Sequence, residues 1–176
     1  MTNVNPQIRI NLQDGRIIDL ELYPDKAPKT VANFLNLVDQ GFYKDVIFHR
    51  TIPDFMVQAG GYHLVNGTLT EKEPSAPIFG EFASNGFPDN DLKHLIGVIS
   101  MARTDDKNSA SCQFFICSAD CPHLDGEYAA FGKTIDFNSD QVVFDMSRAR
   151  TFNIDHTLPN FPYPMIPIKS IERIKP

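Results

Sequence analysis

The sequence predicts a mainly β protein, a closed or nearly closed β-barrel with helices covering its open ends. Short segments in which apolar and polar residues alternate recur along the chain, as half-buried strands require. Two segments, one early and one late, carry apolar residues at helical spacing instead. No internal repeat, low-complexity tract or linker divides the 176 residues, so we expect a single domain over residues 1–176.

The first elements are a β-hairpin and a helix. Residues 8–12 and 18–22 alternate apolar with polar side chains, and Asp14-Gly15 between them favours a tight turn. From Val31 to Val38 the apolar residues recur at i, i+3, i+4 and i+7, which predicts a helix. Pro28 suits its first turn and Gly41 its end.

The remaining elements follow from similar patterns. Residues 47–59 are β-rich and divided by a turn at Pro53-Asp54, whereas residues 60–93 carry the polar and Gly/Pro composition of long surface loops. Gly60-Gly61 indicates a turn. Strands are expected at 95–102, 113–117, 129–135 and 166–174, a polar loop at 103–111, a second helix at 140–149 and an irregular, proline-rich segment at 153–165.

The charge balance and the cysteines exclude several classes of protein. With 16 basic and 22 acidic side chains the net charge is −6. Because Lys and Arg do not cluster, we expect neither a nucleic acid nor an anionic membrane as a partner. The first residues lack a basic region followed by an apolar core, and no apolar run of about 18 residues occurs, so neither a signal peptide nor a spanning helix is expected. Three cysteines favour free thiols and a cytoplasmic protein.

A zinc site is one alternative use of the cysteine-rich segment. The candidate ligands lie within fourteen residues, but the spacing C-x4-C-x3-C-x-H matches no usual zinc motif. The middle cysteine also lies in an apolar run, where Cys commonly behaves as a small buried hydrophobe. The candidate ligands are Cys112, Cys117, Cys121, His123 and Asp125.

A hydrolase triad of Ser111, His49 and Asp45 is a second alternative. No nucleophile elbow or other local signature accompanies these residues. The positions of these residues in the sequence do not show that they meet in the fold, so the lack of a local signature disfavours this interpretation.

Residues 48–61 are the most informative stretch. Because the turn at Pro53-Asp54 resets the alternation of the strand, Arg50 could come to lie beside Phe55, Met56 and Gln58. Composition alone favours a plainer interpretation, a surface arginine and a buried Phe-Met pair.

The same stretch resembles the cyclophilin signature F-H-R-x-I-P-x-F-M-x-Q-x-G. Residues 100–103 with 109–116 resemble the S-M-A and S-x-F-F-I region of that family, and 124–126 with 131–133 resemble its L-D-G and F-G-K region. Residues 28–42 are similar to its first helix. The motifs stand in register between residues 8 and 174, and the resemblance implies an eight-stranded antiparallel β-barrel capped by two α-helices.

The resemblance implies peptidyl-prolyl cis–trans isomerisation without a metal or cofactor. Amide resonance sets a barrier of about 18–20 kcal/mol, and the twisted transition state leaves a localised lone pair on the prolyl nitrogen. Arg50 matches the catalytic arginine, whose donors would bind that nitrogen better in the twisted state than in either planar one. Phe55 and Gln58 complete the catalytic set, Gln58 by contacting the substrate and orienting Arg50.

The resemblance also assigns a peptide groove, with proline-containing peptides and unfolded or folding proteins as partners of a monomeric chain. Phe55 and three of the matched residues would wall the proline pocket, and Gln113 would line the groove. A proline-binding chaperone or scaffold without catalysis is the alternative, which the presence of Arg50 disfavours. The predicted substrate-binding residues are Met56, Ala102, Arg103, Gln113, Phe115, His123, Leu124 and Tyr128.

Several matched positions depart from the family pattern. Arg103 stands where relatives have an asparagine whose backbone holds the residue before proline, and residues 101–104 are more similar to bacterial members. His123 replaces a common tryptophan and Tyr128 a common histidine, and the loop 105–108 is charged and one residue longer. Because imidazole offers less apolar surface than indole, the resemblance implies weak cyclosporin binding.

Overall fold

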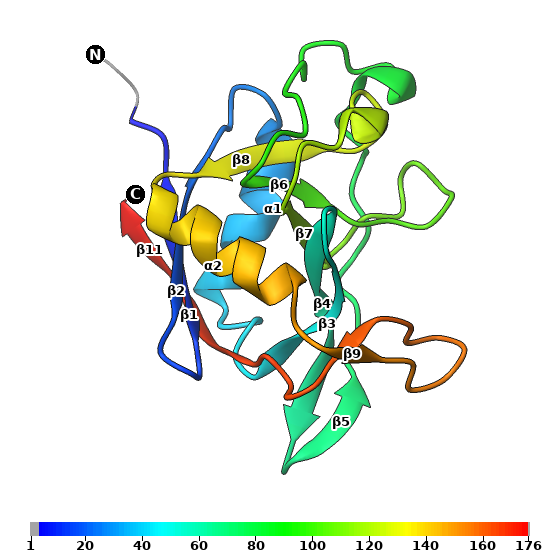
Figure 1. The fold of residues 1–176 in the computed structure, drawn as a ribbon. Helices are drawn as coiled ribbons and strands as arrows, with labels where there is room; N and C mark the ends of the chain where they lie inside the picture. Colours follow the sequence, from blue (N-terminus) through cyan, green and yellow to red (C-terminus); the bar gives the residue numbers. More distant parts are fainter. Residues whose placement is uncertain (1–3, 176) are drawn as a thin grey trace.

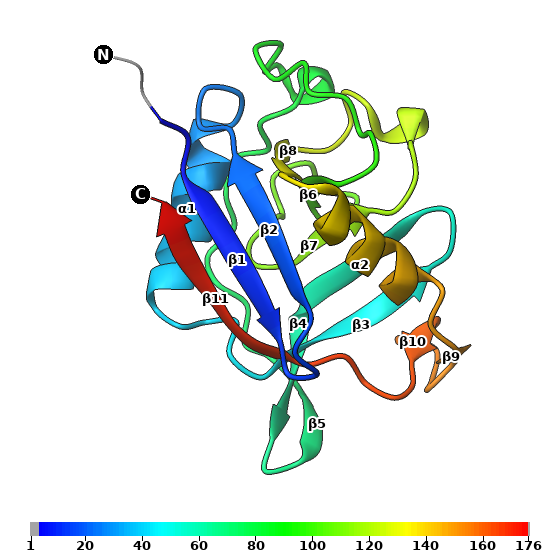
Figure 2. The same cartoon turned by 60° about the vertical axis from the view of Figure 1, so that its left-hand side comes forward.

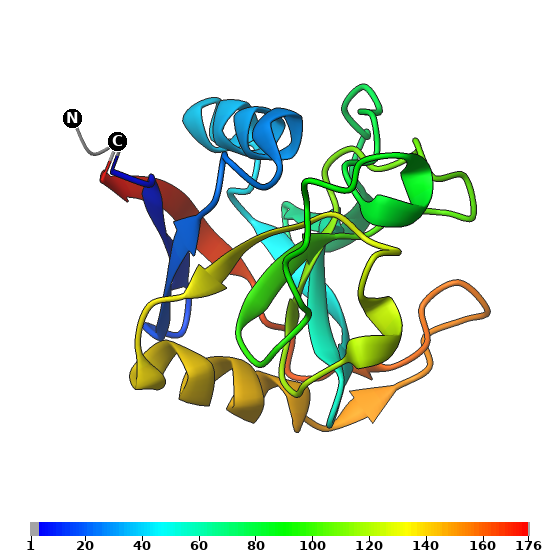
Figure 3. The same cartoon turned by 90° about the horizontal axis from the view of Figure 1, so that it is seen from above.

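The computed structural model describes residues 4–175, so the predicted domain limits at residues 1 and 176 lie outside the described range. Nine of its strands curl into one sheet, β9 and β10 form a separate pair, and the two α-helices lie on opposite sides of the curled sheet (Figure 3). The elements in chain order are β1 (Gln7–Leu12), β2 (Ile17–Leu22), α1 (Pro28–Asp39), β3 (Val46–Ile52), β4 (Met56–Val65), β5 (Thr68–Glu71), η1 (Ala83–Asn85), β6 (Val98–Met101), β7 (Phe114–Cys117), η2 (Pro122–Leu124), β8 (Ala130–Thr134), α2 (Phe137–Ser147), β9 (Thr151–Phe152), β10 (Phe161–Pro162) and β11 (Ile168–Lys175).

Eight strands form the curled path β11-β1-β2-β8-β6-β7-β4-β3, and β5 pairs with β4 beside it (Figure 1). The two ends of this path meet through one isolated bridge, Ile47 to Pro167, and short backbone contacts such as the 3.0 Å bond from the Phe48 N–H to the Ile166 carbonyl. The predicted mainly β fold and its eight strands are confirmed. Full closure was too strong a prediction, because β3 and β11 do not form a continuous ladder.

The main core fills the inside of the curl. Ile8, Ile10 and Leu12 of β1 point into it and are at most 2% exposed, as the alternation predicted. Phe34 of α1 contacts the rings of Tyr43, Phe114 and Phe131, with centroids 5.2–5.6 Å apart. Several of the chain's fourteen phenylalanines therefore serve to fill this core.

Both predicted helices form, and local residues set their limits. Helix α1 begins at Pro28, and the chain turns away at Gly41, whose φ of +69° favours glycine. Helix α2 begins at Phe137, three residues before its predicted start at 140. The Asp136 carboxylate causes this earlier start, since it caps the helix by accepting a 2.7 Å hydrogen bond from the Ser139 N–H. No helix in residues 4–175 is long and apolar enough to cross a membrane.

Residues 60–93 differ most from their prediction as loops. Strand β4 continues to Val65 and returns as β5 through a turn at Asn66-Gly67, so a hairpin extends from the sheet (Figure 2). The predicted turn at Gly60-Gly61 is wrong, because both residues lie inside β4. A Cβ atom on Gly60 would overlap the Cys112 carbonyl oxygen, so these glycines allow close approach of two segments. The proline-rich segment is largely irregular as predicted, apart from the short β9–β10 pair.

Candidate active site

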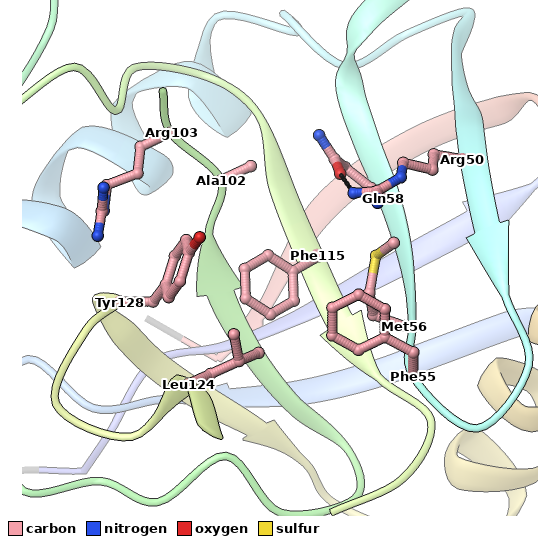
Figure 4. A pocket seen from close by; sticks show the side chains of 9 residues that line it. All are labelled: Arg50, Phe55, Met56, Gln58, Ala102, Arg103, Phe115, Leu124 and Tyr128. Atoms are coloured by element: carbon pink, nitrogen blue, oxygen red, sulfur yellow. Dashed lines mark hydrogen bonds between the residues drawn. The ribbon is translucent and has the colours of Figure 1, made fainter. Parts of the chain in front are cut away.

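A hollow of about 140 Å³ opens where β3, β4 and β7 meet the loops that follow β6 and precede β8. All of its lining side chains are predicted site residues, and Figure 4 shows them converging from these separate elements. Residues more than 70 positions apart in the sequence thus line one site, which we call the proline hollow. The lining residues are Arg50, Phe55, Met56, Gln58, Ala102, Arg103, Phe115, Leu124 and Tyr128.

The β3–β4 hairpin brings Arg50 and Gln58 together. The chain reverses at Asp54, whose φ is +59°, and Arg50 then pairs directly with Gln58 across the two strands. Arg50 Nη1 lies 3.4 Å from Gln58 Oε1, and Gln58 Nε2 donates to Gln113 Oε1 at 2.9 Å. The long contact from Arg50 leaves most of its five N–H donors free for another acceptor.

The floor of the proline hollow is apolar. Met56, Phe115 and Leu124 belong to a small buried cluster that is separate from the main core and also contains Cys117 and Cys121. Phe55, Ala102 and Tyr128 are half-buried around it. The result is a shallow, apolar seat for a compact ring, with the cationic head of Arg50 at its edge (Figure 4).

The sequence reasoning missed a residue that supports this floor, His94. Its ring stacks on Phe115 at an interplanar angle of 16° with centroids 6.1 Å apart. Its Nε2 lies 2.9 Å from Ser100 Oγ, and its Nδ1 lies 3.2 Å from Asp125 Oδ1. Burial lowers the pKa of His94, so the ring is neutral at neutral pH. No periodicity or motif in the sequence distinguished His94.

Arg103 supports the opposite wall through its side chain. The guanidinium lies 4.6 Å from the Tyr128 ring centroid and 5.0 Å from that of Phe82. It also donates to the carbonyl oxygens of Glu127, at 2.7 Å, and Thr104, at 2.9 Å. The resemblance implied only a main-chain role at this position, whereas the structure gives the side chain four contacts.

Two predicted site residues lie beside the proline hollow. Gln113 is joined to it by the hydrogen bond from Gln58 and lines an adjoining hollow. His123 is exposed, and its ring centroid lies 5.6 Å from that of Phe55. Both are therefore placed to touch a ligand that extends beyond the proline hollow.

The candidate zinc ligands do not converge. Within residues 4–175, no group of three or more His, Cys, Asp or Glu side chains is arranged to hold a metal ion. Cys112 is in the main core, where its Sγ lies 3.3 Å from the Gly60 carbonyl oxygen, whereas Cys117 and Cys121 lie under the proline hollow. Burial raises the pKa of both latter thiols, which disfavours the thiolate that zinc requires.

The hydrolase triad does not form either. The Asp45 carboxylate accepts a hydrogen bond from Gln13, and the Ser111 hydroxyl lies 3.7 Å from the Cys112 sulfur. His49 packs against Tyr62 with ring centroids 4.9 Å apart, and its Nδ1 has no hydrogen-bond partner among residues 4–175. The three residues thus have separate surroundings.

Comparisons with known proteins agree with this geometry. The family model described as "Cyclophilin type peptidyl-prolyl cis-trans isomerase/CLD" matches residues 7–172. Peptidyl-prolyl cis-trans isomerase A of Dickeya dadantii is 41% identical over 159 residues, covering 88% of this chain and 75% of the relative. A peptidyl-prolyl cis-trans isomerase of Acinetobacter baylyi is 38% identical, covering 99% of this chain and 90% of the relative.

The fold has solved counterparts. The crystal structure of a Cryptosporidium parvum cyclophilin type peptidyl-prolyl cis-trans isomerase superposes with a TM-score of 0.77 at 30% identity, covering 98% of this chain and 99% of that one. A crystal structure of that protein in the presence of the dipeptide Ala-Pro gives a TM-score of 0.73 at 32% identity, covering 94% and 96%. From its motifs, its curled sheet and these relatives, the chain belongs to the cyclophilin-type peptidyl-prolyl cis–trans isomerases.

Proposed function

We propose that this isomerase acts on X-Pro bonds in peptides and in unfolded or folding proteins, with the proline ring on the apolar floor and Arg50 donating to the prolyl nitrogen. One observation carries the proposal. Two arginines line the proline hollow, and Arg103 is engaged by two rings and two carbonyl oxygens, whereas the contact of Arg50 with Gln58 is too long, at 3.4 Å, to occupy its guanidinium fully. The Ala-Pro dipeptide present with the Cryptosporidium parvum relative supports the assignment of the ligand class.

The chemistry requires only stronger binding of the twisted amide. Rotation about the X-Pro bond ends the amide resonance and localises a lone pair on the prolyl nitrogen. The nitrogen can then accept a hydrogen bond, which it cannot do in the planar cis or trans form. A donor placed there stabilises the transition state more than either ground state, which accelerates the reaction in both directions. Arg50 suits this task because its guanidinium is charged at every physiological pH.

No single contact supplies the whole acceleration. A million-fold enhancement corresponds to about 8 kcal/mol, whereas a hydrogen bond to a charged group contributes about 1.5–3 kcal/mol. Removal of water by the floor of Met56, Phe115 and Leu124 strengthens the bond from Arg50, and anchoring of the peptide on both sides of the proline fixes its geometry. Gln58, held by Gln113, orients the arginine.

Three finer properties belong to the same proposal. The chain acts as a monomer, it binds cyclosporin weakly because His123 offers a small ring at the edge of the groove, and it resides in the cytoplasm. Cys112, Cys117 and Cys121 are free and buried, which supports a reducing compartment. Analytical ultracentrifugation, an inhibition titration and cell fractionation test these three properties in turn.

The decisive experiment compares variants of Arg50 in an isomerisation assay on a proline tetrapeptide, by NMR exchange or protease coupling. Arg50→Ala is expected to lower kcat/KM about ten- to hundredfold, and Arg50→Lys to restore part of it. Arg16→Ala is the matched control, since the ion pair that Arg16 makes within residues 4–175 is with the exposed Asp14 on the β1–β2 turn. Unchanged rates in Arg50→Ala, with an unchanged circular dichroism spectrum, would refute the role of Arg50, whereas absence of turnover by the wild-type chain would favour a binding function.

A further inference from the structure

A second hollow of about 310 Å³ borders the proline hollow across the Arg50–Gln58 pair. The two share Arg50 and Gln58 as a common wall, so a peptide that leaves the proline hollow over this pair enters the second one. We call it the flanking hollow. Its lining residues are His49, Arg50, Gln58, Tyr62, Gln113, Thr157, Leu158 and Pro159.

The outer wall of the flanking hollow is the loop between β9 and β10, which is fastened to the sheet. The Thr51 N–H of β3 donates to the Asn160 carbonyl at 3.1 Å, and β9 and β10 lie beside β3 (Figure 2). The Asp155 carboxylate accepts from the N–H of Thr157 at 2.7 Å and of Leu158 at 3.2 Å. Leu158 is 5% exposed and packs in a cluster with Ile47 and Phe161. These contacts attach the loop wall to the sheet at Asn160 and Leu158.

The flanking hollow has an apolar side and a cationic side. Tyr62, Leu158 and Pro159 provide apolar surface, and His49, which is 5% exposed, packs against Tyr62 with the two rings tilted by 57°. Burial lowers the pKa of His49 to about 4, with a smaller contribution from the charge of Arg50, so this ring is neutral at neutral pH. Its enclosed Nδ1, unpartnered among the described residues, leaves one polar atom unsatisfied beside the hollow.

Arg50 is the charged side chain among the residues that line the flanking hollow. None of the ion pairs formed within residues 4–175 includes Arg50, so no carboxylate compensates its charge. The Asp155 carboxylate of the same loop accepts from the Thr157 hydroxyl at 2.6 Å, which lowers the pKa of Asp155 and keeps it ionised, but Asp155 does not line the hollow. A second cation is therefore repelled here, whereas a bulky uncharged side chain gains the apolar surface.

We propose that the flanking hollow is a specificity subsite that binds a substrate residue close to the proline, favouring bulky apolar and above all aromatic side chains and rejecting Lys and Arg. This inference rests on the proposed function, because the proline hollow must hold the proline for the flanking residue to reach its place. Aromatic rings suit the subsite because they bury a large surface with few rotatable bonds.

The test uses heptapeptides with a central proline, in which one residue two positions before or two positions after the proline is Ala, Phe or Lys. In one of these two series we expect kcat/KM to rise about three- to tenfold from Ala to Phe and to fall below the Ala value for Lys. The series that shows the effect identifies the side of the proline that occupies the flanking hollow.

Thr157→Phe is the diagnostic variant, because Thr157 is exposed on the loop and a phenyl group there fills the flanking hollow. It should abolish the preference for Phe while leaving turnover of a proline tetrapeptide unchanged. His156→Phe is the matched control, since His156 is the exposed neighbour that does not line the hollow, and it should keep the preference.

The two proposals fail in different ways. Equal kcat/KM for Ala, Phe and Lys in both series, or a preference that survives Thr157→Phe, overturns the subsite while tetrapeptide turnover upholds the isomerase. Absence of turnover with the wild-type chain on every peptide overturns the proposed function itself.

Discussion

Replacing Arg103 by alanine should weaken peptide binding more than it slows the isomerisation step. The Arg103 guanidinium lies between Tyr128 and Phe82 and donates to the carbonyl oxygens of Glu127 and Thr104. It thereby holds the Tyr128 wall of the proline hollow in position. Because Arg103 supports the wall, whereas Arg50 is the residue proposed to act on the reacting amide, we treat Arg103 as a positioning residue.

The size of the effect follows from these contacts. Each of the two stacking contacts is worth about 0.5–1 kcal/mol where solvent is near, and each hydrogen bond adds about 0.5 kcal/mol at such a half-exposed site. The wall therefore loses about 2–3 kcal/mol of support, of which part is recovered by relaxation around the alanine. We expect about 1–2 kcal/mol to reach peptide binding, which is a five- to thirtyfold loss in kcat/KM.

The assay separates KM from kcat on a proline peptide by NMR exchange at several peptide concentrations. Arg103→Ala should act mainly on KM, because it removes support that ground and transition states share. Arg103→Lys should recover little, since an ammonium group cannot stack as a planar guanidinium does. Arg16→Ala again controls for the loss of an arginine. A wild-type KM in Arg103→Ala, or a loss of kcat equal to that of Arg50→Ala, would refute the reasoning.

Two further predictions concern histidines. The unfolded chain protonates His49 near pH 6.5 and the folded chain only near pH 4, so the unfolded state binds more protons between these values. The free energy of unfolding should therefore fall by up to about 3 kcal/mol as the pH drops through this window. Urea unfolding at pH 4.5 and 7 should show a smaller loss for His49→Gln than for the wild-type chain, and an equal loss would contradict this role of His49. His123→Trp should lower the cyclosporin inhibition constant about ten- to hundredfold, because indole adds apolar surface and an N–H donor, while tetrapeptide turnover stays nearly constant. Tight inhibition of the unmodified chain would show that position 123 does not control the drug.

The regular elements were predictable where a local pattern alone decides the structure. The hairpin of β1 and β2 follows from alternation and the Asp14-Gly15 turn, and α1 follows from its apolar spacing between Pro28 and Gly41. The turn at Pro53-Asp54 likewise allowed Arg50 and Gln58 to lie side by side, although composition alone favoured a surface arginine, and the strand register pairs the two residues. In each case the deciding residues are neighbours in the chain.

The errors arose where a distant segment decides the structure. Gly60-Gly61 looked like a turn because glycine is common in turns, yet these residues lie within β4 since the segment around Cys112 and Gln113 passes too close for a side chain. Strand β5 was read as loop because its residues are mostly exposed and only pairing with β4 orders them. Closure of the barrel depends on contacts between β3 and β11, more than 100 positions apart.

The candidate site divides in the same way between residues that face the ligand and residues that support them. Arg50, Phe55 and Gln58 stand in a recognisable motif, and the mechanism proposed above uses them as a cation, an apolar ring and an amide at those places. His94 braces Phe115, and Arg103 braces Tyr128, through packing and hydrogen bonds within the protein. A support of that kind leaves no pattern in the sequence, since its partners lie about 20–30 positions away and only the fold brings them into contact. Differences in peptide preference between members of one isomerase family should therefore arise mostly at such supporting positions and at outlying walls like Thr157–Pro159, where substitutions alter the groove without removing the arginine.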